Sequence, residues 1–306
     1  MKVFFNRVPR SEPYGGGNQF LVGMTSLLEE KGHKVAYHLE KDIDVIFMMD
    51  PRPGDIGYSL QHIAQYKHAF PKTKILHRVN ECDQRKGTNE IDRLLLAGMN
   101  ISEEVVFISD WLKRYFEEKG FDRKSSVVYN GCNTGHFFPQ EKKSDNVRLV
   151  THHWSDNWMK GFDLYTELDK YLSENDTDIE FEYIGRYYSG YTPKKTKIIS
   201  PTFGADLGEK LRKNDIYITA SRFEPCGMHH IEGTASGMPV LYHAEGGGIN
   251  EFCKNHGEEF QDFNSFLNGL EKIRKNIKSY QDKIDYDFLS LDRCLNQYLS
   301  IVERMS

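Results

Sequence analysis

Short apolar runs alternate with longer amphipathic segments along almost the whole chain. Runs rich in aliphatic and aromatic residues predict strands, and they lie at residues 3–5, 33–39, 45–49, 74–79, 105–108, 127–129, 147–151, 179–184, 197–199, 216–219 and 239–242. Segments whose apolar residues recur every three or four positions predict helices, and they lie at residues 18–30, 58–70, 89–99, 111–119, 161–174, 206–213, 225–236, 263–278 and 288–305. Ser109 or Asp110 caps the fourth helix, and Gly120 ends it.

Strands that alternate with helices indicate parallel βαβ units rather than a sandwich. The polar, charged and proline-containing stretch at residues 138–146 interrupts the alternation, as a domain linker does. We therefore expect two Rossmann-like α/β domains, residues 1–140 and 147–287, with parallel sheets and a cleft between them. The closing helix, residues 288–306, is expected to pack back on the first domain. Ligands of such sheets bind at the carboxyl ends of the strands.

Composition restricts the class of protein. The length of 306 residues suits two domains at about 150 residues each. The formal net charge of −5 gives no basic field for nucleic-acid binding, so no nucleic-acid partner is expected. We expect no spanning helix and no signal-peptide core, because no apolar run is long enough and Asn6 and Arg7 follow the first strand. Five scattered cysteines without a C-x-x-C pair fit neither a zinc site nor a disulfide framework, and they favour a cytoplasmic protein.

Residues 221–251 carry the densest candidate chemistry. Pro225 suits the first position of a helix that follows a strand, and Gly227 in its first turn would let an anion approach the N–H groups. Glu224 and Glu232 are eight residues apart. On one helix this spacing separates them by about 12 Å along the axis and about 80° around it. That exceeds the separation of about 5 to 9.5 Å in glycosidase pairs, so the two carboxylates would instead bind the two ends of an elongated ligand such as a nucleotide sugar.

This stretch resembles the E-x7-E signature of retaining GT-B glycosyltransferases of family 4. Four further segments resemble motifs of that family, in the same order along the chain: Gly15-Gly16-Gly17 with Gly32-His33-Lys34-Val35, Val128-Tyr129-Asn130-Gly131-Cys132-Asn133 with Phe137, Met159-Lys160-Gly161, and Gly246-Gly247-Gly248 with Glu251. The resemblance spans nearly the whole chain and implies the GT-B fold, with two Rossmann-like domains whose parallel sheets face each other across a cleft.

The resemblance also implies roles for individual residues. Glu224 would lie beside the donor sugar and the reacting centre, Glu232 would accept hydrogen bonds from the ribose, and Lys160 would neutralise the leaving diphosphate without a metal. No cofactor is expected beyond the nucleotide diphosphate sugar itself. Further expected donor-binding residues are Gly227, Met228, His229, Gly185, Arg186, Phe203 and Gly204, together with Gly16 and Gly17 of the first domain.

Two departures from the family pattern concern the donor and acceptor sites. The arginine that usually stands about five residues before the lysine is missing, and Arg186, Arg222 or a histidine could replace it. The family often has a histidine near the sugar at the end of a middle strand; residues 76–83 do not define the matching position, and Asn80 or Asp83 could fill it on the acceptor side, near Arg78. The histidine pairs at 152–153 and 229–230 are poor chelators because adjacent side chains point to different sides, so no metal site is expected.

Three functions remain open at this point. The first is a retaining, metal-independent glycosyltransferase whose acceptor is a saccharide, a lipid or another hydroxyl compound. The second is a non-catalytic protein that binds sugar nucleotides or glycans, which the missing arginine and the short chain favour. The third, an NAD-dependent dehydrogenase, is disfavoured because no G-x-G-x-x-G follows the first strand. Peripheral membrane contact and a monomeric or homodimeric state are both compatible with the sequence.

Overall fold

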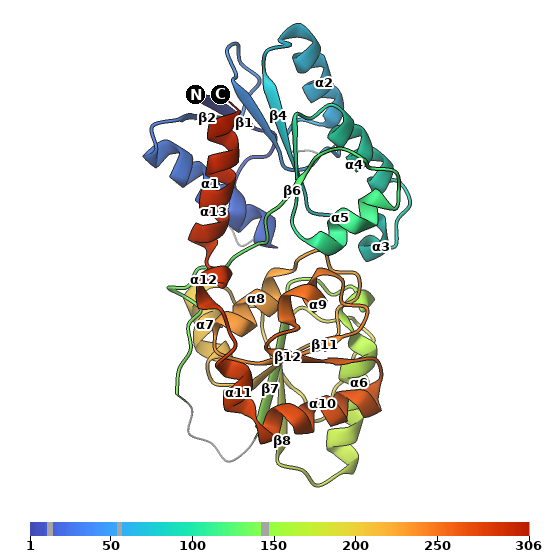
Figure 1. The fold of residues 1–306 in the computed structure, drawn as a ribbon. Helices are drawn as coiled ribbons and strands as arrows, with labels where there is room; N and C mark the ends of the chain where they lie inside the picture. Colours follow the sequence, from blue (N-terminus) through green and yellow to red (C-terminus); the bar gives the residue numbers. More distant parts are fainter. Residues whose placement is uncertain (11–14, 54–56, 142–146, 306) are drawn as a thin grey trace. The chain divides into compact units, whose positions relative to one another are not determined.

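The computed structural model describes residues 1–10, 15–53, 57–141 and 147–305. The chain forms two compact units: unit 1 comprises Met1–Tyr129 and Asp292–Ser306, and unit 2 comprises Asn130–Leu291. Each unit is built on one six-stranded sheet whose strands all pair in parallel (Figure 1). The predicted class, two parallel α/β sheets, is therefore confirmed. The first unit ends closer to the N-terminus than the polar stretch at 138–146, of which residues 142–146 lie outside the described part of the chain.

Unit 1 contains the first six strands in the order β2-β1-β3-β4-β5-β6. Its strands are β1 (Lys2–Phe5), β2 (Lys34–Ala36), β3 (Val45–Met48), β4 (Lys74–Val79), β5 (Glu104–Phe107) and β6 (Ser126–Val127). Its helices are α1 (Gly15–Glu30), α2 (Leu60–Ala69), α3 (Asp83–Lys86), α4 (Ile91–Asn100), α5 (Asp110–Glu117) and α13 (Leu291–Arg304). The strand order reverses between β1 and β3, which makes their carboxyl ends the switch point of this sheet.

Helices cover both faces of the sheet in unit 1. Right-handed crossovers put α1 on one face and α2, α4 and α5 on the other, as Figure 1 shows. The closing helix α13 lies on the α1 face, where the ring of Tyr298 packs 4.8 Å from that of Phe20 and 5.6 Å from that of Phe47. On the other face, Ile63 and Tyr66 of α2 pack against the sheet.

Unit 2 contains the other six strands in the order β12-β11-β10-β7-β8-β9. Its strands are β7 (Val147–His153), β8 (Ile179–Gly185), β9 (Lys197–Ile199), β10 (Ile216–Thr219), β11 (Val240–His243) and β12 (Gly257–Phe260). Its helices are η1 (Trp158–Lys160, a 3-10 turn), α6 (Phe162–Glu174), α7 (Gly204–Leu211), α8 (Met228–Ala235), α9 (Gly248–Cys253), α10 (Phe263–Lys275), α11 (Ile277–Gln281) and α12 (Tyr286–Leu289). This is the Rossmann strand order, and its switch point lies between β7 and β10.

The core of unit 2 is rich in aromatic side chains. Phe162 and Tyr165 of α6 lie with Phe181 and Tyr183 of β8 in one buried cluster, and Phe266 of α10 belongs to the same cluster. The helices α6 and α10 therefore cover one face of the sheet. Crossovers in the opposite direction put α8 and α9 on the other face (Figure 1).

Several predicted boundaries are wrong at the starts and ends of helices. Gly15, Gly16 and Gly17 form the first turn of α1 rather than a loop before it, while residues 13 and 14 of the predicted loop lie outside the described part of the chain. Pro225 is not helical, because α8 begins only at Met228. Ser109, one of two possible caps, does cap α5: its hydroxyl accepts a hydrogen bond from the Leu112 N–H at 3.1 Å.

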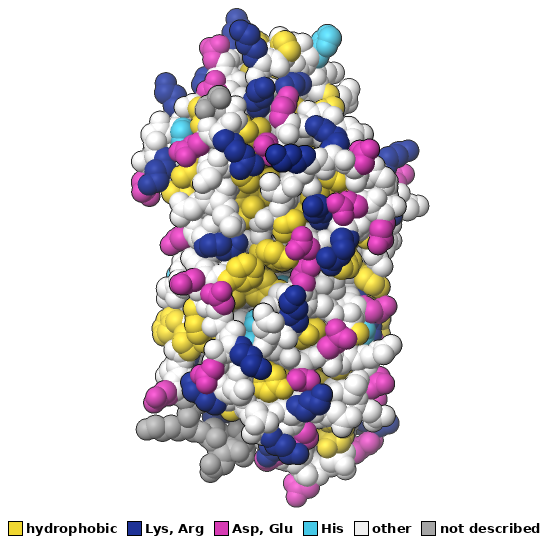
Figure 2. Space-filling model, in the orientation of Figure 1, with side chains coloured by type: hydrophobic (Ala, Val, Ile, Leu, Met, Phe, Trp, Pro, Cys, Tyr) yellow, Lys and Arg dark blue, Asp and Glu magenta, His cyan; other side chains and the backbone are white. Residues whose placement is uncertain are grey.

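Other elements were not predicted because they are short or polar. They are α3, η1, α9 and the edge strand β12, whose sequence Gly-Glu-Glu-Phe has no alternation of apolar and polar residues. The predicted helix at 263–278 is broken at Asn276, and the predicted helix at 288–305 is broken at Ser290, because both residues have non-helical backbone angles. In the described residues, no helix is long and apolar enough to cross a membrane. Figure 2 shows basic and acidic side chains interspersed over the visible face.

One buried carboxylate gives unit 2 an expected sensitivity to acid. Asp169 of α6 accepts hydrogen bonds from the N–H groups of Lys194, Lys195 and Thr196 at 2.6 to 2.9 Å. Burial opposes ionisation, but these bonds and the Thr196 hydroxyl outweigh it and hold the pKa of Asp169 below its ordinary value. A carboxylate with a depressed pKa in the folded state stabilises the fold above its unfolded pKa and loses that contribution as pH falls.

We expect Asp169→Asn to lower the free energy of unfolding near neutral pH by about 1–3 kcal/mol. The variant should also lose part of the acid dependence that the parent protein shows below about pH 4. Urea unfolding followed by circular dichroism between neutral pH and pH about 3 measures both effects. Asp176→Asn, at an exposed position of the same unit, is the control. Equal effects of the two substitutions would contradict the role given to Asp169.

Candidate active site

The predicted catalytic residues gather at the switch point of unit 2. His152 and His153 end β7, Lys160 follows in η1, and Glu224 follows β10. Glu232 lies in the second turn of α8. The order of the strands thus brings together side chains that are far apart in the sequence, at the edge where open α/β sheets bind ligands.

Lys160 and Glu224 form a buried ion pair. Lys160 Nζ donates to Glu224 Oε2 at 2.5 Å, and the two side chains are only 11% and 5% exposed. Gly161 fixes the position of Lys160, because its φ of +94° suits glycine and a side chain there would overlap Ala220. Taking two charges out of water is costly, so a pair this buried requires close geometry.

The backbone of Glu224 is held by the glycine loop 246–248. Its N–H donates to the Gly246 carbonyl at 3.2 Å, and its own carbonyl accepts from the Gly248 N–H at 2.9 Å. A side chain at Gly247, where φ is +73°, would lie 2.8 Å from that carbonyl. The preceding residue, Phe223, has a φ of +53°, which is rare outside glycine and costs about 1–2 kcal/mol. Such a residue persists only where its surroundings fix it, and this is common at functional sites.

Glu232 is paired with a histidine rather than with a lysine or arginine. His152 Nε2 lies 2.7 Å from Glu232 Oε2, and both side chains are at most 10% exposed. The Tyr217 hydroxyl lies 3.1 Å from His152 Nδ1. An imidazole that carries its proton on Nε2 donates to the carboxylate and accepts from the tyrosine, so the three groups form one chain of hydrogen bonds.

The start of α8 lies between the two carboxylates in sequence. Gly227 is its N-cap residue and offers no side chain to the first N–H groups of the helix. A side chain at Gly227 would come within 2.7 Å of the His229 ring. His229 Nε2 lies 3.0 Å from the Thr219 hydroxyl. Burial, followed by the nearby His153 and Lys160, holds the pKa of His229 well below its ordinary value, so this imidazole is neutral.

The predicted geometry of the two glutamates is wrong in one respect. Glu224 pairs with Gly247 as an isolated bridge before the helix, whereas Glu232 is helical. The separation calculated for eight residues of one helix therefore does not apply. The helix starts later because the chain from Phe223 to Gly227 is committed to the glycine loop and to Asn130, whose side-chain amide donates to the Cys226 carbonyl at 2.7 Å.

The other predicted donor-binding residues are spread over unit 2. Met228 is the first residue of α8, and Gly185 ends β8 so close to the His153 carbonyl that a side chain would overlap it. Phe203 is the N-cap residue of α7 and is 55% exposed, and Gly204 opens that helix with a φ of +59°. The helix α7 follows the edge strand β9, whereas the Lys160–Glu224 and His152–Glu232 contacts lie at the centre of the sheet.

Three side chains were candidates to replace the missing arginine. Arg222 donates to Asp163 at 2.5 Å and lies 3.6 Å from Glu245. The Arg186 guanidinium stacks 4.1 Å above the Trp154 ring. A histidine, His152, contacts Glu232 directly. The structure thus places a histidine, and neither arginine, in contact with a predicted donor-binding carboxylate.

The predicted residues of the first domain lie in unit 1. Gly16 and Gly17 belong to the first turn of α1. Arg78 of β4 is buried, with its guanidinium 4.4 Å above the Phe20 ring, and Asn80 follows that strand.

Asp83 uses its carboxylate within unit 1. It accepts from the Ile91 and Asp92 N–H groups, both at 3.0 Å, and from the Thr88 hydroxyl at 2.5 Å. Burial opposes ionisation of Asp83, but these bonds hold its pKa below the ordinary value. Asp83 therefore joins α3 to the start of α4, a role that its place in a polar string did not predict.

Tyr217 contacts His152, and Asn130 contacts the backbone shortly before α8, although neither was predicted to belong to the site. Tyr217 reads only as an apolar strand residue, and its contact with His152 depends on the pairing of β7 with β10. Asn130 belongs to the motif at residues 128–133, and that motif is the sequence feature that could have predicted its place in the site. Within the described part of the chain, no three His, Cys, Asp or Glu side chains come together in a way that could hold a metal ion.

Known structures share the fold over nearly the whole chain. Sucrose-phosphate synthase from Thermosynechococcus elongatus superposes with a TM-score of 0.75 at 12% identity, covering 99% of this chain and 98% of that one. HepE from Anabaena, solved in complex with UDP-glucose, superposes with a TM-score of 0.73 at 15% identity, covering 99% and 100%. These likenesses define the fold as GT-B.

Glycogen synthases are among the relatives that the chain resembles in sequence. No protein-family model matches the chain. The glycogen synthase of Bacillus cereus strain Q1 is 20% identical over 362 aligned positions, which cover 92% of this chain and 74% of that protein. The glycogen synthase of Exiguobacterium sibiricum is 30% identical over 142 positions, 40% of this chain and 29% of that protein. The chain is therefore similar, over nearly its whole length, to GT-B glycosyltransferases of the family 4 type.

The buried pair predicts strong thermodynamic coupling between its partners. In a double-mutant cycle of Lys160→Met and Glu224→Gln, we expect a coupling energy of about 1–3 kcal/mol, because each single change disturbs a desolvated partner. Thermal or urea unfolding of the four proteins measures it. The exposed pair Lys213 and Glu209, 2.8 Å apart on α7 and its C-terminal turn, is the control and should show much weaker coupling. A coupling near zero for Lys160 and Glu224 would contradict the geometry.

Proposed function

We propose that this glycosyltransferase moves a sugar from a nucleotide diphosphate sugar to a hydroxyl acceptor with retention of configuration and without a metal ion. The observation that carries the proposal is the pairing of Lys160 with Glu224 and of His152 with Glu232 at the switch point of unit 2. Packing of the sheet does not require two buried carboxylates with polar partners, so their presence at this edge favours a role in ligand binding.

Lys160 and the start of α8 would bind the diphosphate. Departure of a nucleoside diphosphate develops negative charge, and a fixed cation together with helix N–H groups stabilises it. Lys160 suits this role because it is already desolvated and oriented by Glu224. The Gly227 N-cap leaves room for an anion close to the helix backbone. Since the protein supplies the positive charge, the leaving group needs no metal.

Glu224 would contact the donor sugar, and Glu232 would accept hydrogen bonds from the ribose hydroxyls. His152 would orient Glu232, because one carboxylate oxygen is engaged by the imidazole at 2.7 Å. On this assignment His152 is a positioning residue. The leaving diphosphate would accept the proton of the attacking hydroxyl on the same face of the sugar, which is consistent with retention.

The acceptor in this proposal is any compound with a free hydroxyl group: a saccharide, a lipid or another hydroxyl compound. HepE, the structural relative above, was solved with UDP-glucose, and we propose a nucleotide sugar of this kind as donor. The rival function, a non-catalytic sugar-nucleotide binder, rests on the missing arginine. It predicts binding of the donor without release of the nucleoside diphosphate.

The first functional prediction concerns the chemical step. We expect Glu224→Gln and Lys160→Ala each to lower turnover by about 10²–10³-fold, the usual cost of one electrostatic contact in the transition state. Nucleoside diphosphate release, measured with the donor that the wild-type protein consumes, reports turnover. Glu167→Gln, at an exposed position of α6, should retain the parent rate. Near-normal transfer by both variants would show that Glu224 and Lys160 are not catalytic residues.

The second prediction separates binding from chemistry. We expect Glu232→Gln to raise KM for the donor by about tenfold or more with a smaller change in kcat, since a hydrogen bond to a charged group contributes about 1.5–3 kcal/mol. His152→Gln, which keeps a donor at the end of a flexible side chain, should show the same pattern more weakly. Steady-state kinetics and calorimetric titration with the donor measure both. A pure kcat effect in either variant would reject the ribose-side assignment.

A further inference from the structure

Arg222 lies between β10 and α8, two residues before Glu224, and its side chain is 20% exposed. The chain here contacts two other segments of the site. One is the stretch 158–163, which contains η1, Lys160 and the start of α6, and the other is the glycine loop 246–248 with Glu245 before it. The function proposed above gives Arg222 no role. A guanidinium that is mostly removed from water requires polar partners, and Arg222 has partners on both segments.

The segment that carries Lys160 is held on both sides of that residue. The Arg222 N–H donates to the Met159 carbonyl at 3.0 Å. Its guanidinium donates through Nη2 to Asp163 Oδ2 at 2.5 Å. Met159 immediately precedes Lys160, and Asp163 lies in the first turn of α6, three residues after it. One arginine therefore fixes the chain before and after the lysine of the buried pair.

The glycine loop that holds Glu224 is bound by the same stretch of chain. Arg222 Nε lies 3.6 Å from Glu245 Oε2. The next N–H, that of Phe223, donates to the Glu245 carbonyl at 2.7 Å, and the N–H after it belongs to Glu224 and donates to the Gly246 carbonyl at 3.2 Å. A side-chain contact and two consecutive backbone contacts thus connect the Arg222 stretch to this loop.

His243, at the end of β11, faces the same group of charges. The Glu245 N–H donates to His243 Nδ1 at 3.0 Å. Burial, followed by the charge of Arg222, holds the pKa of His243 below its ordinary value, so this imidazole is neutral near neutral pH. The Arg222 guanidinium is the cation that contacts both carboxylates, those of Asp163 and Glu245. Its loss would remove the attraction that draws their two segments together.

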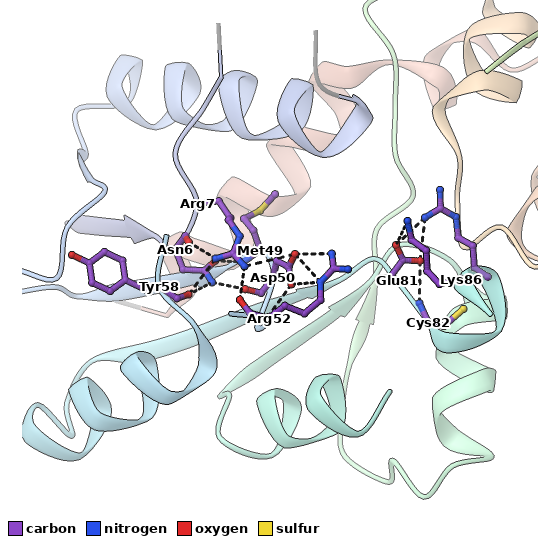
Figure 3. Close-up of polar contacts among 10 residues, drawn as sticks. Asn6, Arg7, Met49, Asp50, Arg52, Tyr58, Glu81, Cys82 and Lys86 are labelled. Atoms are coloured by element: carbon purple, nitrogen blue, oxygen red, sulfur yellow. Dashed lines mark hydrogen bonds and ion pairs between the residues drawn. The ribbon is translucent and has the colours of Figure 1, made fainter. Parts of the chain in front are cut away.

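Polar side chains also join strand ends in unit 1, at the carboxyl edge of its sheet. Asn6 donates to the Asp50 carbonyl at 2.6 Å, and Arg52 donates to the Asp50 carboxylate at 2.7 Å (Figure 3). Lys86 lies 3.5 Å from Glu81 in the same view. The proposed transfer gives no role to any of these residues, so a polar contact between strand ends is not by itself evidence of function. The arginine of unit 2 differs because the segments that it joins carry the buried pair of the proposed site.

We propose that Arg222 is a positioning residue for glycosyl transfer, which holds Lys160 and Glu224 at the separation that the reaction requires. The proposal rests on the proposed function, because it treats this pair as the one that meets the diphosphate and the sugar. Two side chains on separate segments stay in contact only if their segments do, and Arg222 is bound to both. A planar guanidinium can donate in several directions at once, whereas a lysine ammonium is a compact point charge. A displacement of about 1 Å at a reacting centre can lower the rate by about 10²-fold.

Steady-state kinetics of Arg222→Gln and Arg222→Lys, with the donor that the wild-type protein consumes, form the first part of the test. We expect Arg222→Gln to lower kcat by about tenfold or more with a smaller change in KM, because the charge that Lys160 meets grows as the diphosphate leaves. Arg222→Lys should lower kcat by less, since it keeps the charge but not the geometry of the guanidinium.

Arg274 provides the matched control in the same unit. It also pairs with one aspartate and one glutamate: it donates to Asp178 and lies 3.7 Å from Glu271, and its side chain is 35% exposed. Its partners carry no residue of the proposed site. Arg274→Gln and Arg274→Lys should therefore retain the parent kcat, even if they lower the stability of the fold.

The coupling between Lys160 and Glu224 forms the second part of the test and needs no donor. It is measured by unfolding of the double-mutant cycle Lys160→Met and Glu224→Gln in three backgrounds: the parent, Arg222→Gln and Arg274→Gln. We expect the coupling energy to fall to about half or less in Arg222→Gln and to stay unchanged in Arg274→Gln. An arginine that only stabilises the fold would lower the stability of all four proteins of the cycle equally and leave the coupling as it is.

The proposal is overturned if Arg222→Gln keeps the kcat of Arg274→Gln, or if the coupling is the same in these two backgrounds. If Arg222→Gln does not fold, Arg222→Lys and Arg274→Lys take their places, and equal kcat or equal coupling in that pair overturns the proposal. Failure of the wild-type protein to consume any nucleotide sugar would refute the proposed transferase activity instead. The coupling measurement would then still decide whether Arg222 positions the buried pair.

Discussion

The buried pair of Lys160 and Glu224 is the constraint around which unit 2 is arranged. Two charges taken out of water are tolerated only when their positions are fixed. The chain fixes Lys160 through Gly161, which packs on Ala220, and fixes Glu224 through the glycine loop at 246–248. The left-handed backbone of Phe223 is a cost of the same arrangement. These features fit the role proposed for Lys160, a cation that is fixed in place before a ligand binds.

The two sheets place their chemistry at equivalent points. In each sheet the strand order reverses, and at the carboxyl ends beside that reversal the chain gathers charged side chains. In unit 2 these are carboxylates paired with a lysine and a histidine, and in unit 1 they are arginines and a lysine around Asp50 and Glu81. An anionic donor would meet the local cation of unit 2, so a weakly acidic chain needs no extended basic surface.

The sequence predicted what depends on local pattern and on motifs. The bounds of β4, β9 and β10 match the prediction, because an apolar run between turn residues defines a strand. The start of α8 differs from the prediction. Pro225 suits the start of a helix locally, but contacts with the distant glycine loop keep Glu224 extended. The role of Asp83 likewise depends on N–H groups of the following helix. The conformation of Glu224 and the role of Asp83 depend on contacts with residues distant in the sequence, which local patterns do not show.

The most direct test of the central claim is phosphorus NMR of the wild-type protein with UDP-, GDP-, ADP- and dTDP-glucose in turn. We expect at least one donor to bind and to be converted to free nucleoside diphosphate, slowly by hydrolysis or faster with an acceptor. Binding of a donor without any release would make the chain a sugar-nucleotide binder. Absence of both binding and release for every donor would contradict the assignment of the site in unit 2.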